Sequence, residues 1–339
     1  MTRPALFALA VALCSGSAAF AAAGARVEVP IHQSVLENGA PRYWVELSIA
    51  GGAPIRAMLD TGSTGLRVLA LEARDLQAAG PSQDYGYTSG ARFSGPTVKA
   101  QIALGSAHTG SDFPFQRIET IGCSEAKPDC PVGKVAVADY RIGGRGARGF
   151  TAILGSNMGD ADAPNPLKSL AESWIIELPL AGSDAPGRLI LNPRDDETAG
   201  FTRVQLDPAF ATLRGGFHDA VPGCVGKADG SARLCGPMLL DSGAPAVEVT
   251  LGKDQKAQAW SAGTSARLSI GRPDAFVAMP FTTDRDQAAK LRLREGRGQP
   301  RNRISAGSLP FQAFAVFYDP KERILGLKPR TPDTATETP

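Results

Sequence analysis

Residues 57–63 of this 339-residue chain read Ala57-Met58-Leu59-Asp60-Thr61-Gly62-Ser63, and residues 238–244 repeat the pattern as Met238-Leu239-Leu240-Asp241-Ser242-Gly243-Ala244. In each copy, three apolar residues that predict a buried strand lead into an acid, a hydroxyl residue and a glycine. One copy alone is typical of a hairpin turn, because Asp and Gly are turn formers. Two copies, 181 positions apart (241 − 60), indicate two similar halves that each offer one carboxylate.

The rest of the chain predicts a mostly-β protein with few helices. Residues 43–49 and 98–104 alternate apolar and polar side chains, and Gly or Pro bounds each segment. Helices are expected only at residues 69–79, 166–173 and 284–293. The length is sufficient for two cores of roughly 150 residues each. We therefore expect an all-β fold in two halves.

Two acids in one site have a chemical use. Carboxylates that share a site cannot both ionise easily, so one holds a proton while the other acts as a base. The repeat therefore marks Asp60 and Asp241 as candidate catalytic residues.

Several further segments resemble the pepsin-like aspartic proteases, and together they span most of the chain. Residues 43–63 are similar to the first hairpin and catalytic loop of that family. A second segment resembles the flap that covers the cleft in that family; it consists of Tyr87-Thr88-Ser89-Gly90 and the strand that follows. A third segment resembles the family's apolar-apolar-Gly element, which lies behind the first catalytic loop; here it reads Ala152-Ile153-Leu154-Gly155. Residues 170–191 and 314–327 are similar to the family's lobe junction and C-terminal strands.

This resemblance implies an all-β, bilobal fold with two β-barrel-like lobes and a cleft between them. The N-terminal lobe would span residues 26–197, with the first catalytic Asp and the flap, and the C-terminal lobe residues 198–330. The implied activity is that of an aspartic endopeptidase, a hydrolase that cleaves peptide bonds with a water activated between Asp60 and Asp241. A peptide or protein substrate would bind extended in the cleft as an added strand.

The resemblance also assigns supporting roles to residues around the acids. Thr61 and Ser242 would brace the two loops through their hydroxyls, and Gly62 and Gly243 would let backbone N–H groups approach the carboxylates. The flap residues would be Tyr87 and Gly90. Ser63 can donate to Asp60, whereas Ala244 in the matching position has no hydroxyl for Asp241. We therefore expect Asp241 to be the more basic acid and the working pH to be mildly acidic or near neutral.

Two departures from the family pattern support a second interpretation. Arg67 follows Leu66 where the family usually has an aromatic residue that hydrogen-bonds the flap tyrosine. Ser305-Ala306-Gly307 stands where the second half should have bulky aliphatic residues before the glycine. The alternative function is a catalytically silent pepsin-like scaffold that binds a protein or glycan partner.

The N-terminal residues and the cysteines predict export. Arg3, an apolar run over 5–13 and a small-residue site at 19–21 indicate a signal peptide within residues 1–25. The expected location is periplasmic or secreted, and no later segment has the 18 apolar residues that a stable membrane anchor would need. Four cysteines remain after residue 25 and allow three pairings, of which we expect the local one, Cys123 with Cys130 and Cys224 with Cys235.

Charge and composition exclude other classes of function. Thirty-six basic against 34 acidic residues give a formal charge of +2, which excludes a dedicated nucleic-acid binder. The three histidines are too far apart for a metal-ligand motif, and the GxGxxG pattern at 144–149 precedes a strand-like segment, so no metal or cofactor is expected. Basic residues over 290–303 predict a solvated helix end and loop, or a rim that favours acidic peptides. We expect a monomer with a disordered tail at 331–339.

Overall fold

Twenty-five strands and three short α-helices make up the described part of the chain, so the expected all-β class is confirmed. The computed structural model describes residues 24–36, 39–130, 132, 139–145, 149–180, 183–210, 216–253, 255–296 and 298–330. Most of the predicted signal peptide, and the predicted tail at 331–339, lie outside these residues. No helix in the described ranges has the length and apolar character needed to cross a bilayer.

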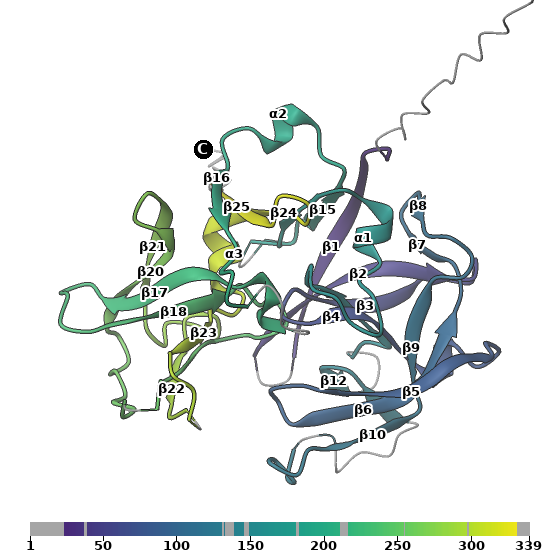
Figure 1. The fold of residues 1–339 in the computed structure, drawn as a ribbon, viewed down its shortest axis with the longest axis horizontal. Coiled ribbons are helices and arrows are strands. Elements are labelled where there is room, and N and C mark those ends of the chain that lie inside the picture. The colour runs from purple at the N-terminus through teal and green to yellow at the C-terminus, as the bar shows by residue number, and fades with distance from the viewer. Residues whose placement is uncertain are drawn as a thin grey trace, which may run out of the picture.

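Sixteen strands join in the larger sheet, which combines strands from both ends of the chain (Figure 1). Its main path runs in the order β10 (Thr120–Cys123), β6 (Ala91–Lys99), β9 (Pro114–Ile118), β4 (Thr64–Leu69), β13 (Ala152–Ser156), β3 (Ile55–Asp60), β2 (Pro41–Ile49), β1 (Val27–Val35), β15 (Gly187–Leu191), β14 (Trp174–Glu177), β24 (Phe314–Asp319), β25 (Ile324–Pro329) and β16 (Thr202–Gln205). Beside this path, β5 (Ala78–Gly86) pairs with β6, and β7 (Ile102–Leu104) pairs with β2 and with β8 (Ala107–His108).

Seven strands form a second sheet, which lies on the left in Figure 1, while the N-terminal strands lie on the right. Its order is β21 (Ala275–Thr282), β20 (Ser265–Arg272), β17 (Val221–Lys227), β18 (Arg233–Leu239), β23 (Arg303–Ser305), β19 (Val247–Thr250) and β22 (Leu291–Arg294). A two-stranded ribbon consists of β11 (Tyr140–Arg141) and β12 (Gly144–Arg145). Over the described residues, no sheet closes into a barrel.

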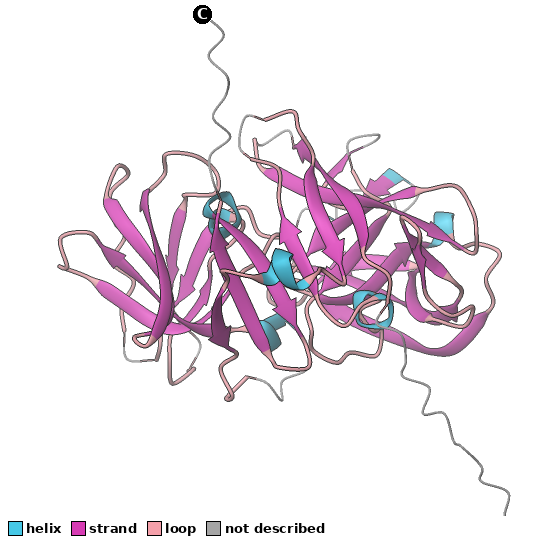
Figure 2. Ribbon diagram, turned by 90° about the horizontal axis from the view of Figure 1, so that it is seen from above, coloured by secondary structure: helices cyan, strands magenta, loops and turns pink. Residues whose placement is uncertain are grey.

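The helices are few and short, as Figure 2 shows. They are α1 (Leu167–Leu170), α2 (Asp195–Thr198) and α3 (Leu309–Ala313), with 3-10 turns η1 (Ala70–Glu72) and η5 (Gly216–Asp219). The helix expected at 166–173 is present as α1 alone. The predicted helix at 69–79 is wrong, because its last residues enter β5 and pair with β6. The predicted helix at 284–293 is also wrong, since β22 pairs in parallel with β19. Pairing in a sheet outweighs helix propensity in both segments.

The repeated sequence pattern has a structural counterpart. In the first half, β13 lies between β3 and β4, parallel to β3 and antiparallel to β4. In the second half, β23 lies in the same way between β18 and β19. Gly155 is in register with Asp60, and the backbone N–H of Asp241 donates to the carbonyl of Gly307 at 3.1 Å. Each acid is thus held at the end of one three-stranded unit, and the two units repeat one arrangement.

Buried side chains fix both units. The three apolar residues before Asp60 and the three before Asp241 are each at most 7% exposed. Gly155 and Gly307 have no room for a side chain, because an added Cβ would lie 2.8 Å from the Gly65 backbone and 2.5 Å from the Ala246 carbonyl oxygen. The apolar runs and these close backbone contacts together determine where each acid lies.

Candidate active site

The two acids, distant in sequence, lie against each other's loops. A Cβ built on Gly62 would be 2.3 Å from Oδ1 of Asp241, and one built on Gly243 would be 2.4 Å from Oδ1 of Asp60. Any larger residue at either glycine would therefore collide with the opposite carboxylate. The structure brings together the two acids that the repeat singled out.

Thr61 and Ser242 join the two loops through reciprocal hydrogen bonds. The Ser242 hydroxyl accepts from the Thr61 backbone N–H at 3.0 Å, and the Thr61 hydroxyl accepts from the Ser242 backbone N–H at 2.9 Å. The Thr61 hydroxyl donates to the carbonyl of Leu240, and the Ser242 hydroxyl donates to the carbonyl of Leu59, each at 2.7 Å. All of these bonds are buried, so they restrict relative movement of the two acids.

The two carboxylates receive different hydrogen bonds. Asp60 accepts from the Ser63 hydroxyl at 2.7 Å and from the Gly62 backbone N–H at 2.9 Å. Asp241 accepts from the Ala244 backbone N–H at 3.1 Å and from the Ser305 hydroxyl at 3.3 Å. Ala244 has no hydroxyl, as the sequence states, but Ser305 supplies a weaker one. The sequence analysis treated Ser305 only as a departure from the family pattern and missed this role, because the two residues are 64 positions apart in the chain.

Burial dominates the titration of both acids. It raises the pKa of Asp60, although hydrogen bonds from Ser63 and Gly62 act in the opposite direction. Burial, reinforced by the charge of Asp60, raises the pKa of Asp241 to about 7. A proton is therefore retained between the carboxylates well above the usual range of Asp. One acid can donate this proton while the other accepts one from water.

Arg67 occupies a buried position beside the first loop. Its side chain is fully packed, with the residue 2% exposed, and it donates to the carbonyl of Thr64 at 2.7 Å. Its guanidinium carbon lies 3.4 Å from the centroid of the Tyr85 ring. The charges of Asp60 and Asp241 both act to raise the pKa of Tyr85, after burial, which has the largest effect. Tyr85 is therefore a site residue that the sequence analysis missed.

Tyr87, the predicted flap residue, lies within an apolar cluster. Its ring packs against Phe93, with centroids 5.2 Å apart, and burial raises the pKa of its phenol. Among the described residues, its hydroxyl has no hydrogen-bond partner. The backbone N–H of Gly90, with φ +97°, donates to the carbonyl of Tyr87 and closes the hairpin turn between β5 and β6.

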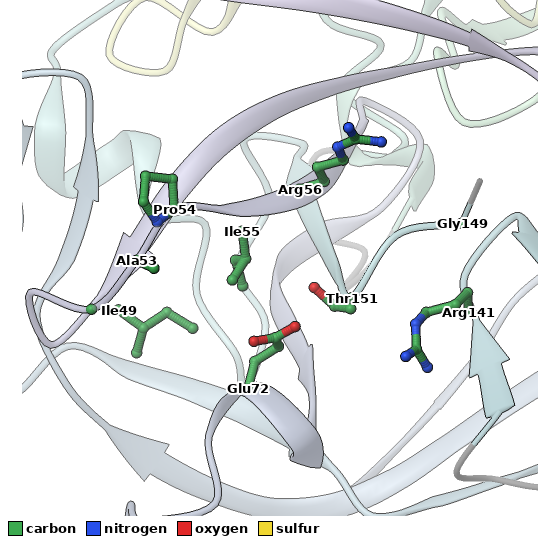
Figure 3. A pocket seen from close by; sticks show the side chains of 10 residues that line it. Ile49, Ala53, Pro54, Ile55, Arg56, Glu72, Arg141, Gly149 and Thr151 are labelled. Carbon is green, nitrogen blue, oxygen red and sulfur yellow. The ribbon is translucent and has the colours of Figure 1, made fainter. Parts of the chain in front are cut away.

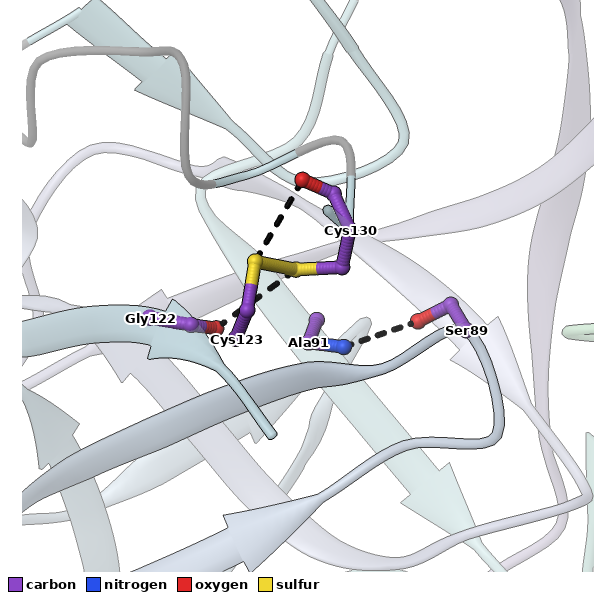
Figure 4. The surroundings of a disulfide bond; sticks show 5 residues. All are labelled: Ser89, Ala91, Gly122, Cys123 and Cys130. Atoms are coloured by element: carbon purple, nitrogen blue, oxygen red, sulfur yellow. Dashed lines mark hydrogen bonds between the residues drawn. A yellow bond between two sulfur atoms is a disulfide. The ribbon is translucent and has the colours of Figure 1, made fainter. Parts of the chain in front are cut away.

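A disulfide loop covers this hairpin turn (Figure 4). Cys123 bonds to Cys130, and Cys224 bonds to Cys235, which is the local pairing that the sequence predicts. Within the first loop, the backbone N–H of Ser124 donates to the carbonyl of Gly90, and Lys127 donates to the carbonyl of Thr88. The β5–β6 hairpin is thus bonded to a covalently closed loop. Disulfides of this kind fit an oxidising compartment.

One surface pocket lies away from the acids. It has a volume of about 540 Å³, and its lining includes neither Asp60 nor Asp241. Figure 3 shows the charged side chains of Arg56, Glu72 and Arg141 around it. Over the described ranges, no three His, Cys, Asp or Glu side chains form a group that could hold a metal ion.

No family model matches this chain, and no curated protein matches it. The function is therefore inferred from the residues of the site and their geometry.

Proposed function

We propose that this protein is an exported, pepsin-like aspartic endopeptidase that acts in the periplasm or outside the cell. The observation that carries the proposal is the pair of Asp-Thr-Gly and Asp-Ser-Gly loops, which meet through the Thr61–Ser242 bonds and place each acid against the other loop's glycine. The repeated three-stranded units around the acids support a bilobal arrangement with one catalytic loop from each half.

The reaction follows from the titration of the acids. At mildly acidic pH the pair carries one proton and one negative charge, because the pKa of Asp241 is raised to about 7. The ionised carboxylate removes a proton from water as the water attacks the peptide carbonyl carbon. The protonated carboxyl donates its proton to the carbonyl oxygen, and a tetrahedral diol forms. Proton transfer to the leaving nitrogen then lets the C–N bond break, without a covalent acyl-enzyme.

A second candidate function is a silent scaffold that binds a protein or glycan. Two observations favour it. Arg67 occupies the position of the family's aromatic partner for the flap, and the flap hairpin is hydrogen-bonded to the Cys123–Cys130 loop. A hairpin restrained in this way would not close over a substrate.

A peptide digest distinguishes these two functions. The exported protein is incubated with a mixed peptide library between about pH 3 and pH 8, with and without a statine-type inhibitor. For a protease we expect new peptide termini that disappear with the inhibitor and are absent from the Asp60→Asn variant. Intact peptides throughout this range, with the inhibitor still bound, would support the scaffold instead.

A further inference from the structure

Arg42 lies on the same face of the sheet as Asp60. Strands β2 and β3 pair antiparallel, with Trp44 opposite Met58. Arg42 lies two residues before Trp44 on β2, and Asp60 lies two residues after Met58 on β3, so Arg42 and Asp60 are opposite each other. Side chains two residues apart in a strand point to the same face of the sheet. This register brings a cation to the end of β2 that adjoins the end of β3, where the first acid lies.

The charges of both acids act on Arg42. Burial lowers the pKa of its guanidinium, and the charges of Asp241 and Asp60 oppose this effect. Nevertheless, within the described residues no carboxylate forms an ion pair with Arg42. Its one hydrogen bond there is from Nη1 to the carbonyl of Pro41, at 2.8 Å. A guanidinium has five N–H donors, so most of them have no protein partner in this part of the chain.

Neighbouring cations differ from Arg42 in this respect. Arg67 donates to the carbonyls of Thr64 and Gly65 and stacks on Tyr85. Arg56 lies on β3, two residues before Met58, and its guanidinium carbon is 4.6 Å from the centroid of the Trp44 ring. Arg42 is a half-buried cation beside the acids with few protein partners. Such a cation gains most from a carboxylate that arrives with a ligand, because a bidentate pair satisfies two of its donors at once.

We propose that Arg42 is a specificity-determining residue that binds an Asp or Glu side chain of the peptide substrate close to the scissile bond. This inference rests on the proposed function and names its substrate class, namely acidic peptides. The raised pKa of Asp241 agrees with it, since an acid pair that works near pH 6 does so where substrate carboxylates, with pKa values near 4, are ionised.

The test compares matched peptides that differ only in Glu against Gln at each position flanking a cleaved bond. For the wild-type protein at about pH 6, we expect kcat/KM to be about tenfold higher for the Glu peptide at one of these positions. Arg42→Gln should reduce that ratio to about one. Arg56→Gln is the matched control, because it removes a cation on the neighbouring strand and should leave the ratio unchanged.

Three results would overturn the proposal. The first is a wild-type ratio near one at every position, which requires no variant and so does not depend on how Arg42→Gln folds. The second is a ratio that survives in Arg42→Gln. The third is an equal shift of the pH profile for both peptides with the ratio unchanged, which would show that Arg42 acts only on the titration of the acids.

A binding measurement separates this proposal from the proposed function. Calorimetry with Asp241→Asn compares the Glu and Gln peptides without turnover, and the double variant with Arg42→Gln repeats the comparison. If the calorimetry shows a preference for Glu that depends on Arg42 while the wild-type protein cleaves no peptide, the result supports the acidic ligand and rejects the protease. Cleavage without any Glu preference supports the protease and rejects the role of Arg42.

Discussion

The guanidinium of Arg67 stacks on the ring of Tyr85, 3.4 Å from its centroid, and the same side chain donates to the carbonyl of Thr64, close to the loop that carries Asp60. A buried cation and a phenol ring thus pack together beside the loop that carries Asp60. Arg67 also donates to the carbonyls of Thr64 and Gly65, so it supports the start of β4, directly after the loop that follows Asp60. One side chain therefore connects the loop that carries Asp60 to the flap hairpin.

Replacing Arg67 by Met should destabilise the protein. The buried carbonyl of Thr64 would lose its donor and Tyr85 would lose its stacking partner, so we expect the free energy of unfolding to fall by about 2 to 4 kcal/mol. Urea unfolding at neutral pH measures this loss. Arg67→Lys keeps a cation and should lose less. A Met variant as stable as the wild type would show that apolar packing can replace this buried cation.

Substituting either acid by Asn should abolish peptide cleavage and leave the fold intact. Both acids are buried and their pKa values are raised, so burying the ionised carboxylate costs free energy. A neutral amide of the same shape avoids this cost and removes no stabilising charge. We expect less than about 1% of wild-type turnover in Asp60→Asn and in Asp241→Asn, with thermal midpoints within a few degrees. Residual turnover above this level in both variants would contradict the two-acid mechanism. EDTA should not change the wild-type rate.

The pH dependence of activity should respond in opposite directions to two hydroxyl substitutions. Ser305 donates to the ionised form of Asp241, so Ser305→Ala should raise the pKa of that acid and move one limb of the kcat/KM profile to higher pH. Ala244→Thr should add a donor and move a limb to lower pH. Profiles that stay fixed in both variants, or a wild-type optimum below about pH 3, would show that other groups control the protonation.

Stability should decrease as pH rises from about 4 to about 7. Asp241 has a pKa of about 7 in the folded protein, against a value near 4 in the unfolded chain, so the unfolded state releases its proton first. The contribution of Asp241 to stability is therefore complete below pH 4 and is lost as the pH approaches 7. Urea unfolding across this range should show a weaker decline for Asp241→Asn. Asp84→Asn is the control, since the pKa of that exposed acid is lowered.

Removing the first disulfide should release the flap hairpin. The Cys123→Ser, Cys130→Ser double variant opens a loop of eight residues, which the chain-entropy model values at about 2.5 kcal/mol. We also expect faster hydrogen exchange at residues 87–90, because their bonds to Ser124 and Lys127 depend on that loop. The variant without Cys224 and Cys235 should lose similar stability with unchanged exchange at these residues. Equal hydrogen exchange at residues 87–90 in the two variants would show that the Cys123–Cys130 bond does not restrain the hairpin.

The acids, the brace between their loops and the disulfide pairing could be predicted because each depends on a local pattern of residues. Asp60 and Asp241 stand out through repetition, and the cysteines through their spacing. The predicted helices at 69–79 and 284–293 failed because strands distant in the chain supply the pairing there. Ser305 and Tyr85 contact the site from distant segments, and the register of β2 and β3 places Arg42 opposite Asp60, which no single segment of sequence encodes.

The sheet order has a consequence for when this site can form. Strand β14 pairs with β24 near the end of the described chain, and the Asp241 loop is held by Gly307. The Asp60–Asp241 pair therefore cannot be complete until residue 307 has been synthesised. Contacts over such sequence distances also form slowly, so the two acids come together late in folding. For the exported protease proposed above, this order of assembly would keep an unfinished chain inactive inside the cell.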